Sequence, residues 1–379
     1  MDVGEFLRWI ETAPAPRRAE AAHALARDYL YGEQDAEVRN AMEAALTVLL
    51  DDPATDVRLA LADSLGASED APRHVIVSLA GDDVEVATLV LSRSPVLIDA
   101  ELVDVVAVAA CPLQVAVARR PVLSHGVSAA IAEVGDLPAC LALLDNPGAE
   151  IARISFTRMA ERFSDDAEIR GALLMREDLP PEVRQRLIRA VGDRLSEFVS
   201  SKAWVSEKRA IAVTREACDR ATAAIAAETQ TDELGALVEH LRVTNQLTTA
   251  LLLRTVCAGN VPFFETALAV LSRVPERRIR TLVRTGRTSG LAAAYQRAGL
   301  PPAAFRAFAA AIDTWRQVSV DGEIADRYRF TRETVDAVLA RYADVTDGEM
   351  NELTAMLRRF AADQAREAAR DYARAAVAA

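Results

Sequence analysis

Apolar residues recur at helical spacing along most of the chain, in short runs separated by polar turns. Val57, Leu61 and Leu65 follow one another every four positions, which predicts the buried face of one helix. Asp52–Pro53 comes shortly before this run, and an acid and a proline are typical of the first turn of a helix. We therefore expect a helical hairpin to turn here, with Val57 pointing into its core.

The same arrangement of an aliphatic residue, a turn and a second aliphatic residue returns along the N-terminal half. The first pair is Leu50 and Val57, and later pairs are Leu79 with Val86, Val108 with Val115, and Leu144 with Ile151. We expect hairpin turns near Asp52–Pro53, Gly81–Asp83, Cys111–Pro112, Asn146–Pro147 and Leu179–Pro181. A unit of this length that recurs along a chain is typical of a helical solenoid, because a single hairpin cannot bury its apolar face alone. The sequence therefore predicts an all-α fold, a curved right-handed solenoid of stacked hairpins.

Two of these turns resemble a known repeat. The segments "DDPATDVRLALADSL" and "DNPGAEIARIS" resemble HEAT repeats, in which Asp-Pro at the turn is followed by Val-Arg on the second helix. This resemblance implies a HEAT-like α-solenoid.

The C-terminal half keeps a helical pattern but resembles something narrower. The run "LTTALLLRTVCAGNVPFFETALAVLSRVPERRIRTLV", residues 247–283, resembles the signature block of the uncharacterised bacterial family catalogued as domain of unknown function 2336. That resemblance implies a helical fold with no attached activity. We expect a HEAT-like repeat region over 1–200, a second helical lobe over 201–320 and C-terminal amphipathic helices over 321–379.

Charge is distributed unevenly along a chain whose net charge is −12. Residues 51–105 carry twelve acids and three arginines, and several acids, including Asp82 and Asp83, fall at expected turns, where helix capping accounts for them. Residues 275–300 hold six arginines against the single acid Glu276. The first region favours a basic partner segment, and the second favours an acidic or phosphorylated one.

The arginines near residue 280 are the candidate partner-binding residues. Inward-facing Ile279, Leu282 and Val283 would leave the arginines on or near one exposed side of a helix. The candidate residues are Arg277, Arg280, Arg284 and Arg287. The alternative is an ordinary solvated surface, or pairing with acids of neighbouring helices.

No sequence motif indicates catalysis, a cofactor or a metal. The four histidines and four cysteines show no metal-binding spacing, and "GRTSG" at 286–290 lacks the lysine of a phosphate-binding loop. Ser124 and His125 are adjacent, but adjacency alone does not make a nucleophile and base pair. The cysteines lie among aliphatic residues, as small buried residues do in a reducing compartment. We expect no catalytic residues, no cofactor and no metal ligand, and therefore no enzyme.

The C-terminal tail predicts two amphipathic helices. Val335, Val338 and Leu339 mark the first, and Leu353, Leu357 and Phe360 mark the second, which should start near Thr346 or Asp347. They would either cap the last repeat or dock against a second copy, which leaves a homodimer possible.

These observations favour a cytoplasmic, non-enzymatic scaffold or adaptor that binds a protein partner. The alternative is a nucleic-acid-binding protein, or a HEAT-like glycosylase- or lyase-type enzyme, that uses the arginine strip at 277–287. A pI near 5.0 opposes nucleic acid as partner. The beginning of the chain lacks the pattern of a signal peptide, and no apolar run has the length of a membrane span, so no membrane partner is expected.

Overall fold

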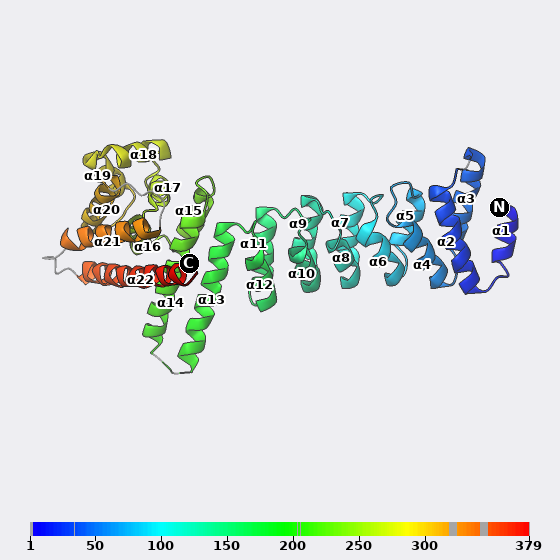
Figure 1. Ribbon diagram of the computed structural model, residues 1–379, viewed down its shortest axis with the longest axis horizontal. Helices are drawn as coiled ribbons and strands as arrows, with labels where there is room; N and C mark the ends of the chain where they lie inside the picture. The colour runs from blue at the N-terminus through cyan, green and yellow to red at the C-terminus, as the bar shows by residue number, and fades with distance from the viewer. Residues whose placement is uncertain are drawn as a thin grey trace. The chain divides into compact units, whose positions relative to one another are not determined.

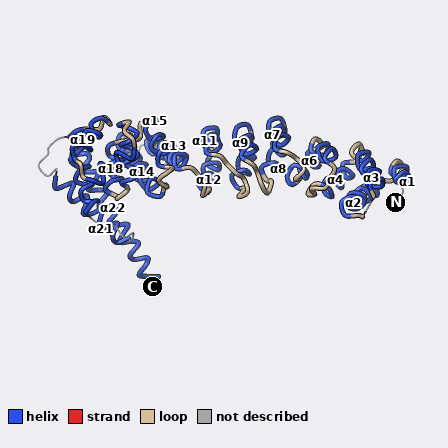
Figure 2. The backbone as a smooth tube through the Cα atoms, turned by 90° about the horizontal axis from the view of Figure 1, so that it is seen from above, coloured by secondary structure: helices blue, strands red, loops and turns tan. Residues whose placement is uncertain are grey.

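The computed structural model describes residues 3–33, 35–202, 204, 206–317, 324–341 and 348–378. Within these residues the protein is all-helical, and its only β-type pairing is an isolated bridge between Leu123 and Ala149. Two compact units divide the chain, Met1–Pro180 and Pro181–Ala379. Figures 1 and 2 show the helices of each unit. No helix in the described ranges is long and apolar enough to cross a membrane.

The described residues of the first unit form twelve helices. They are α1 (Val3–Ile10), α2 (Ala15–Tyr31), α3 (Ala36–Leu49), α4 (Thr55–Leu65), α5 (Arg73–Ala80), α6 (Val84–Arg93), α7 (Asp99–Val108), α8 (Cys111–Ala118), α9 (His125–Val134), α10 (Leu137–Asp145), α11 (Arg153–Arg162) and α12 (Ala167–Met175). Helices α2, α4, α6, α8, α10 and α12 pack one after another, and α7, α9 and α11 form part of a second row. Each row buries aliphatic side chains against its neighbours.

The hydrophobic register predicted from sequence places Val57, Leu79, Val86, Leu144 and Ile151 correctly inside, but Leu50 is only half-buried and the third hairpin departs from it. Val57 and Val86 are fully buried, whereas Val108 is 87% exposed. Only two residues separate α7 from α8, so the buried positions move to Val106 on one side of the turn and Val117 on the other. The predicted Val108–Val115 register is therefore wrong by two residues on each side.

The predicted turns fall close to the observed helix ends, with local corrections. Cys111 and Pro112 are the first residues of α8 rather than the turn itself, as expected for proline at the start of a helix. Pro53 precedes α4, which begins at Thr55, so it does not occupy the first helical turn.

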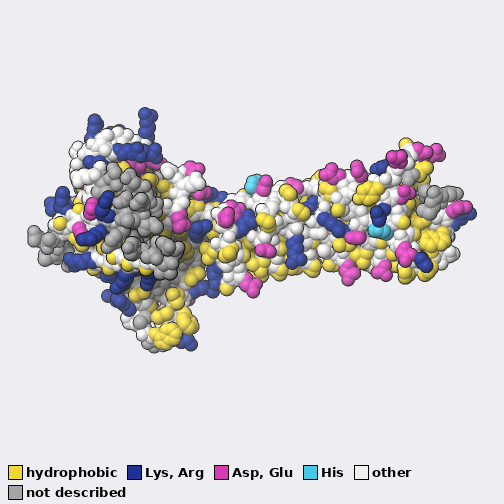
Figure 3. Space-filling model, viewed as in Figure 1, with side chains coloured by type: hydrophobic (Ala, Val, Ile, Leu, Met, Phe, Trp, Pro, Cys, Tyr) yellow, Lys and Arg dark blue, Asp and Glu magenta, His cyan; other side chains and the backbone are white. Residues whose placement is uncertain are grey.

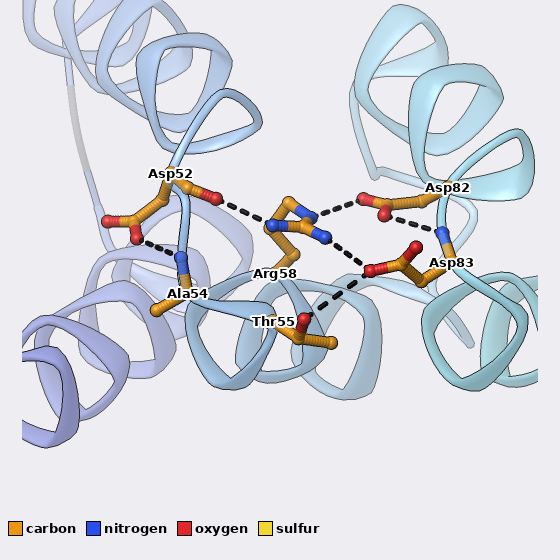
Figure 4. A network of polar contacts seen from close by, with 6 residues as sticks. All are labelled: Asp52, Ala54, Thr55, Arg58, Asp82 and Asp83. Carbon is orange, nitrogen blue, oxygen red and sulfur yellow. Dashed lines mark hydrogen bonds and ion pairs between the residues drawn. The ribbon is translucent and has the colours of Figure 1, made fainter.

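Asp83 occupies the N-cap position of α6, but its side chain accepts no hydrogen bond from that helix; Asp82 and Asp83 bind Arg58 of the preceding hairpin instead. Figure 4 shows this guanidinium, which donates to Asp82 Oδ2 at 2.7 Å, to Asp83 Oδ2 at 2.8 Å and to the main-chain oxygen of Asp52 at 2.6 Å. The Asp52 carboxylate accepts from Arg18 at 2.7 Å and from the amide of Ala54 at 2.9 Å. The arginine hydrogen bonds hold the pKa of Asp52 below its ordinary value. Much of the acidity at these turns is therefore neutralised inside the unit.

A ladder of polar side chains joins successive helices of the α4–α12 row. Each member lies at or just after the C-terminal end of one helix and donates to main-chain oxygens at the end of the preceding helix of the row. The members are Arg93 to Ala62 and Asp63, Arg120 to Leu91 and Ser94, Asn146 to Ala118 and Arg120, and Arg176 to Asn146 and Ala149. The last carbonyls of a helix have no partner within it, and a cation there also complements the helix dipole. The ladder therefore satisfies helix ends that stacking would otherwise bury.

The second unit contains ten α-helices and one short 3₁₀ turn among its described residues. They are α13 (Pro181–Ser201), α14 (Glu207–Glu228), α15 (Leu234–Val243), α16 (Thr249–Cys257), α17 (Val261–Ser272), α18 (Glu276–Thr285), α19 (Thr288–Arg297), η1 (Pro302–Ala304), α20 (Phe305–Gln317), α21 (Ile324–Arg341) and α22 (Gly348–Ala378). A core of aliphatic and aromatic residues runs through α15–α22, and Phe264 stacks on Phe308 at its centre. The predicted region 1–200 ends inside this unit, because α13 packs against α14.

The apolar stripes predicted for the C-terminal tail enter this core. Val335 and Val338 on α21, and Leu357 and Phe360 on α22, are buried. Arg220 of α14 also pairs with Asp363 of α22 at 2.7 Å. The start predicted for the second tail helix, near Thr346–Asp347, lies outside the described residues. The apolar stripes therefore pack into the core of their own chain.

Candidate functional site

The candidate site lies around α18 and α19, where two short helices meet at a tight turn. Pro275 precedes α18, and Gly286 ends it in the left-handed conformation, with φ of 70°. The positive φ favours glycine at this position, and the guanidinium of Arg316 fills the space beside it. Ile279 and Val283 bury one face of α18 against the core. The opposite face presents the arginines to solvent, as Figure 3 shows for the Lys and Arg side chains gathered over this part of the unit.

Three arginines surround an open hollow of about 380 Å³ beside the first turns of α18. Arg277 and Arg278 come from α18 and Arg287 from the turn before α19, and Pro275, Thr281 and Leu282 complete the lining. All three arginines are exposed, and none forms an ion pair with any residue that the structure describes. The hollow therefore offers three guanidinium groups, one threonine hydroxyl and an apolar floor.

The position of these arginines is unfavourable for the helix itself. The N-terminal end of a helix carries a partial positive charge, so each cation placed in the first turn costs about 0.3–1 kcal/mol. Arg277 and Arg278 occupy that turn, and the one acid there, Glu276, pairs with Arg280 at 2.7 Å instead. An anion in the hollow would offset this repulsion, because it would face both the guanidinium groups and the helix end.

Arg280 and Arg284 are directed to a different environment. Arg280 approaches the buried carboxylate of Glu265 on α17 at 3.5 Å, in addition to its pair with Glu276. Burial raises the pKa of Glu265, whereas the charges of Arg284 and Arg280 lower it. One oxygen of Glu265 has no hydrogen-bond partner among the described residues. These two arginines thus compensate a buried acid.

The predicted arginine strip is therefore divided. The structure brings Arg277 and Arg287 together at the hollow. Arg280 instead pairs with Glu265, the structural alternative stated above, and Arg284 is linked to that acid only through the effect of its charge on the pKa of Glu265. Arg278 belongs to the hollow although the helical stripe excluded it. It lies about 100° around the helix from Arg277, so the two side chains point in different directions. They line one site only because the hollow is wide enough to reach both. The sequence signal that could have included Arg278 is the pair of arginines directly after Pro275–Glu276.

Other reactive groups do not assemble into a comparable site. Ser124 caps α9 by accepting from the amide of Val127, and His125 lies 3.7 Å from Glu150 on an exposed surface. Burial raises the pKa of the Cys140 thiol to about 11 and that of Cys257 to about 12, so both remain protonated at neutral pH. Within the described ranges no group of three metal-binding side chains comes together.

A second hollow lies in the first unit between the ends of α10 and α12. Leu144, Pro147 and Met175 form part of its lining, together with three acids. Its arginine, Arg176, is already held by Asp178 at 2.7 Å and by two main-chain oxygens. This hollow has no free cation to offer and no paired reactive groups.

Comparison with known proteins identifies a family without an assigned activity. A family model described as "Uncharacterised protein conserved in bacteria (DUF2336)" matches residues 86–347, which include the arginine hollow. No curated protein and no solved structure matches the chain.

Proposed function

The chain belongs to the bacterial family DUF2336, and we propose that it is a non-enzymatic adaptor whose arginine hollow binds an acidic or phosphorylated segment of a protein partner. The observation that carries the proposal is the group of Arg277, Arg278 and Arg287, which surround one hollow without an acid of their own. Guanidinium groups bind carboxylates and phosphates through paired hydrogen bonds, and a phosphate offers three acceptor oxygens. Thr281 adds a hydroxyl that can donate to the same anion.

The first unit fits the role of a scaffold. We propose that its two rows of helices form a HEAT-like solenoid, because hairpins of similar length stack in sequence order and share the ladder of capping side chains. Such a surface suits extended partners. Its acids, however, are partly engaged, since Asp52, Asp82 and Asp83 bind arginines of the same unit. A basic partner segment on residues 51–105 is therefore the weaker of the two predicted contacts.

A cytoplasmic location is part of the same proposal. All four cysteines are free, and free buried cysteines are usual in a reducing compartment.

The proposal is tested with a fluorescent peptide that carries two phosphoserines among acidic residues, titrated with the full chain and read by anisotropy. We expect binding that weakens at high salt, and a loss of at least about tenfold in the variant Arg277→Gln/Arg278→Gln/Arg287→Gln. The matched control is Arg297→Gln/Arg306→Gln, which removes exposed arginines outside the hollow. Circular dichroism verifies that all variants keep the helical fold.

Each outcome decides between the alternatives. Equal affinity of the hollow variant and the control variant would refute the site. Binding of the unphosphorylated peptide with equal affinity would assign the hollow to acidic segments in general. Tighter binding of a duplex DNA probe, lost in the hollow variant, would replace the adaptor by the nucleic-acid alternative.

A further inference from the structure

The helices of the α13–α14 hairpin continue beyond the core that covers their other ends. Figure 1 shows the two helices reaching past the neighbouring helices of the unit. Both exceed twenty residues, whereas α15–α20 have nine to thirteen. Only the proximal parts contribute large side chains to the unit's interior, among them Leu187 and Ile225. The distal part depends on contacts within the hairpin.

The seam of the distal hairpin is built from small residues. Gly192 and Ala210 are buried there, and Ser196 and Thr214 are half-buried. A side chain at position 192 would collide with the sulfur of Cys218, so the two helices approach closely at this point. Small residues allow close helix packing, but they bury little apolar area.

The large apolar side chains lie beside this seam rather than in it. Val191, Leu195 and Phe198 follow one another at i, i+4 and i+7, one position before Gly192, Ser196 and Val199, and form a continuous stripe on α13. Their side chains are 46%, 55% and 50% exposed. Stripes of this spacing are typical of a helix that packs against another helix.

Aromatic residues extend the stripe to the turn of the hairpin. Trp204 is 68% exposed and meets Phe198 edge to face, with ring centroids 5.8 Å apart. The ammonium of Lys202 lies 5.7 Å from the centroid of Phe198. Figure 3 shows hydrophobic side chains gathered at this end of the hairpin. The apolar surface is therefore continuous from α13 to the turn, and no other described element of the unit covers it.

We propose that this stripe, Val191, Leu195, Phe198 and Trp204, is a dimer interface that binds the same hairpin of a second copy of the chain. The pattern is self-complementary. An antiparallel pair of α13 helices with a two-fold axis at Leu195 places the small Val191 of one copy opposite the large Phe198 of the other, and the reverse. Two hairpins joined in this way form a four-helix bundle, the usual arrangement by which helical hairpins bury such stripes.

The available area meets the requirement of a small specific dimer. A fully buried aromatic side chain covers roughly 150–250 Å², so the exposed parts of these four residues supply about 400 Å² of apolar surface per copy. Two copies with their flanking atoms then bury about 1,000 Å², the lower limit for a specific interface.

The charges near the turn favour a second copy over a lipid surface. Glu197 and Glu207 lie at the same end of the hairpin as Lys202 and Lys208, which are the only two lysines of the chain. Mixed charge suits a protein interface with a polar rim. An anionic membrane would attract the lysines and repel the acids, and it would repel the rest of a chain whose net charge is −12.

The proposal is tested on the full chain by sedimentation equilibrium over about a hundredfold range of concentration. We expect a species of about 82 kDa, twice the mass of 40.9 kDa, that dissociates on dilution. Leu195→Glu/Phe198→Glu should weaken the dimer at least about tenfold while circular dichroism shows that the variant keeps its helical fold, because both side chains are exposed in the single chain. The control is Val108→Glu/Ile154→Glu, which alters exposed aliphatic residues elsewhere and should leave the dimer unchanged.

A crosslink locates the two-fold axis. Leu195→Cys should give a disulfide-linked dimer under mild oxidation, whereas Val243→Cys, at another exposed position, should not.

A monomeric protein at all concentrations would overturn the proposal. So would a dimer that survives Leu195→Glu/Phe198→Glu, which would assign the interface to another surface such as the C-terminal helices. If instead the wild-type monomer sediments with phosphatidylglycerol vesicles and the variant does not, the stripe is a lipid-binding surface.

Discussion

Val57 and Val108 provide a direct test of the fold, because the sequence register treats them as equivalent and the structure does not. Val57 is fully buried on α4, and Val108 is 87% exposed at the end of α7. Val57→Ala removes two methyl groups, a transfer term of about 1.6 kcal/mol, and the cavity left behind raises the expected loss to about 2–3 kcal/mol. Val57→Asp adds a buried carboxylate without a partner and should cost about 4 kcal/mol or more.

The assay is thermal and urea unfolding of the full chain, followed by circular dichroism, with any separate transitions of the two units resolved. For a unit of this size, 1 kcal/mol shifts the melting temperature by about 2–4 °C, so Val57→Asp should lower the transition of the first unit by at least about 8 °C. Val108→Asp should change its stability by less than about 0.5 kcal/mol. Equal losses in the two aspartate variants would refute the observed register, and an unchanged transition for Val57→Asp would show that position 57 faces solvent.

Three further predictions concern polar groups. Arg58→Ala should destabilise the first unit by about 2–3 kcal/mol in urea unfolding, because Asp82 and its neighbours lose charge-assisted hydrogen bonds in a half-buried site. Arg58→Lys should recover part of that loss. Burial lowers the pKa of His240 below its ordinary 6.5, so as the pH falls the unfolded chain binds this proton at a higher pH than the folded chain does. The stability present above pH 6.5 should therefore fall as the pH decreases toward the lowered pKa. His240→Gln should show a smaller decrease when unfolding is measured at several pH values. Arg120→Met should cost about 2–4 kcal/mol by leaving buried main-chain oxygens without donors, whereas Met at the exposed neighbour Arg119 should be nearly neutral in the same assay.

Helical periodicity predicted the class of fold and much of the core, because burial of an aliphatic stripe is a local property of a helix. It placed Val57 and Val86 correctly inside. It failed at Val108 because the register after a turn depends on the length of that turn, and a two-residue turn cannot be distinguished from a longer one by spacing alone. It also assigned Asp82 to helix capping, since the partner of that acid lies 24 residues away on another hairpin.

The candidate site was predictable only in part, for a similar reason. The excess of arginine in residues 275–300 marked the segment that lines the hollow, but a helical wheel treats Arg280 and Arg277 alike. Which arginine remains available depends on Glu265, a buried acid from the preceding helix whose proximity no spacing rule reveals. The distal hairpin was missed altogether, because a stripe such as Leu195 and Phe198 indicates a core in sequence, and only the structure shows that nothing in the described chain covers it.

Arginine has two distinct uses in this protein, and the contrast strengthens the assignment of the hollow. In the first unit, arginines such as Arg58 and Arg120 bind acids or main-chain oxygens of a neighbouring hairpin. Their guanidinium groups are therefore already paired where the hairpins stack. The arginines of the hollow have no such role, and Arg277 and Arg278 stand at a helix end that disfavours them. Packing therefore explains the first group without reference to a partner. It does not explain the second, whose unfavourable placement the proposed anion would offset.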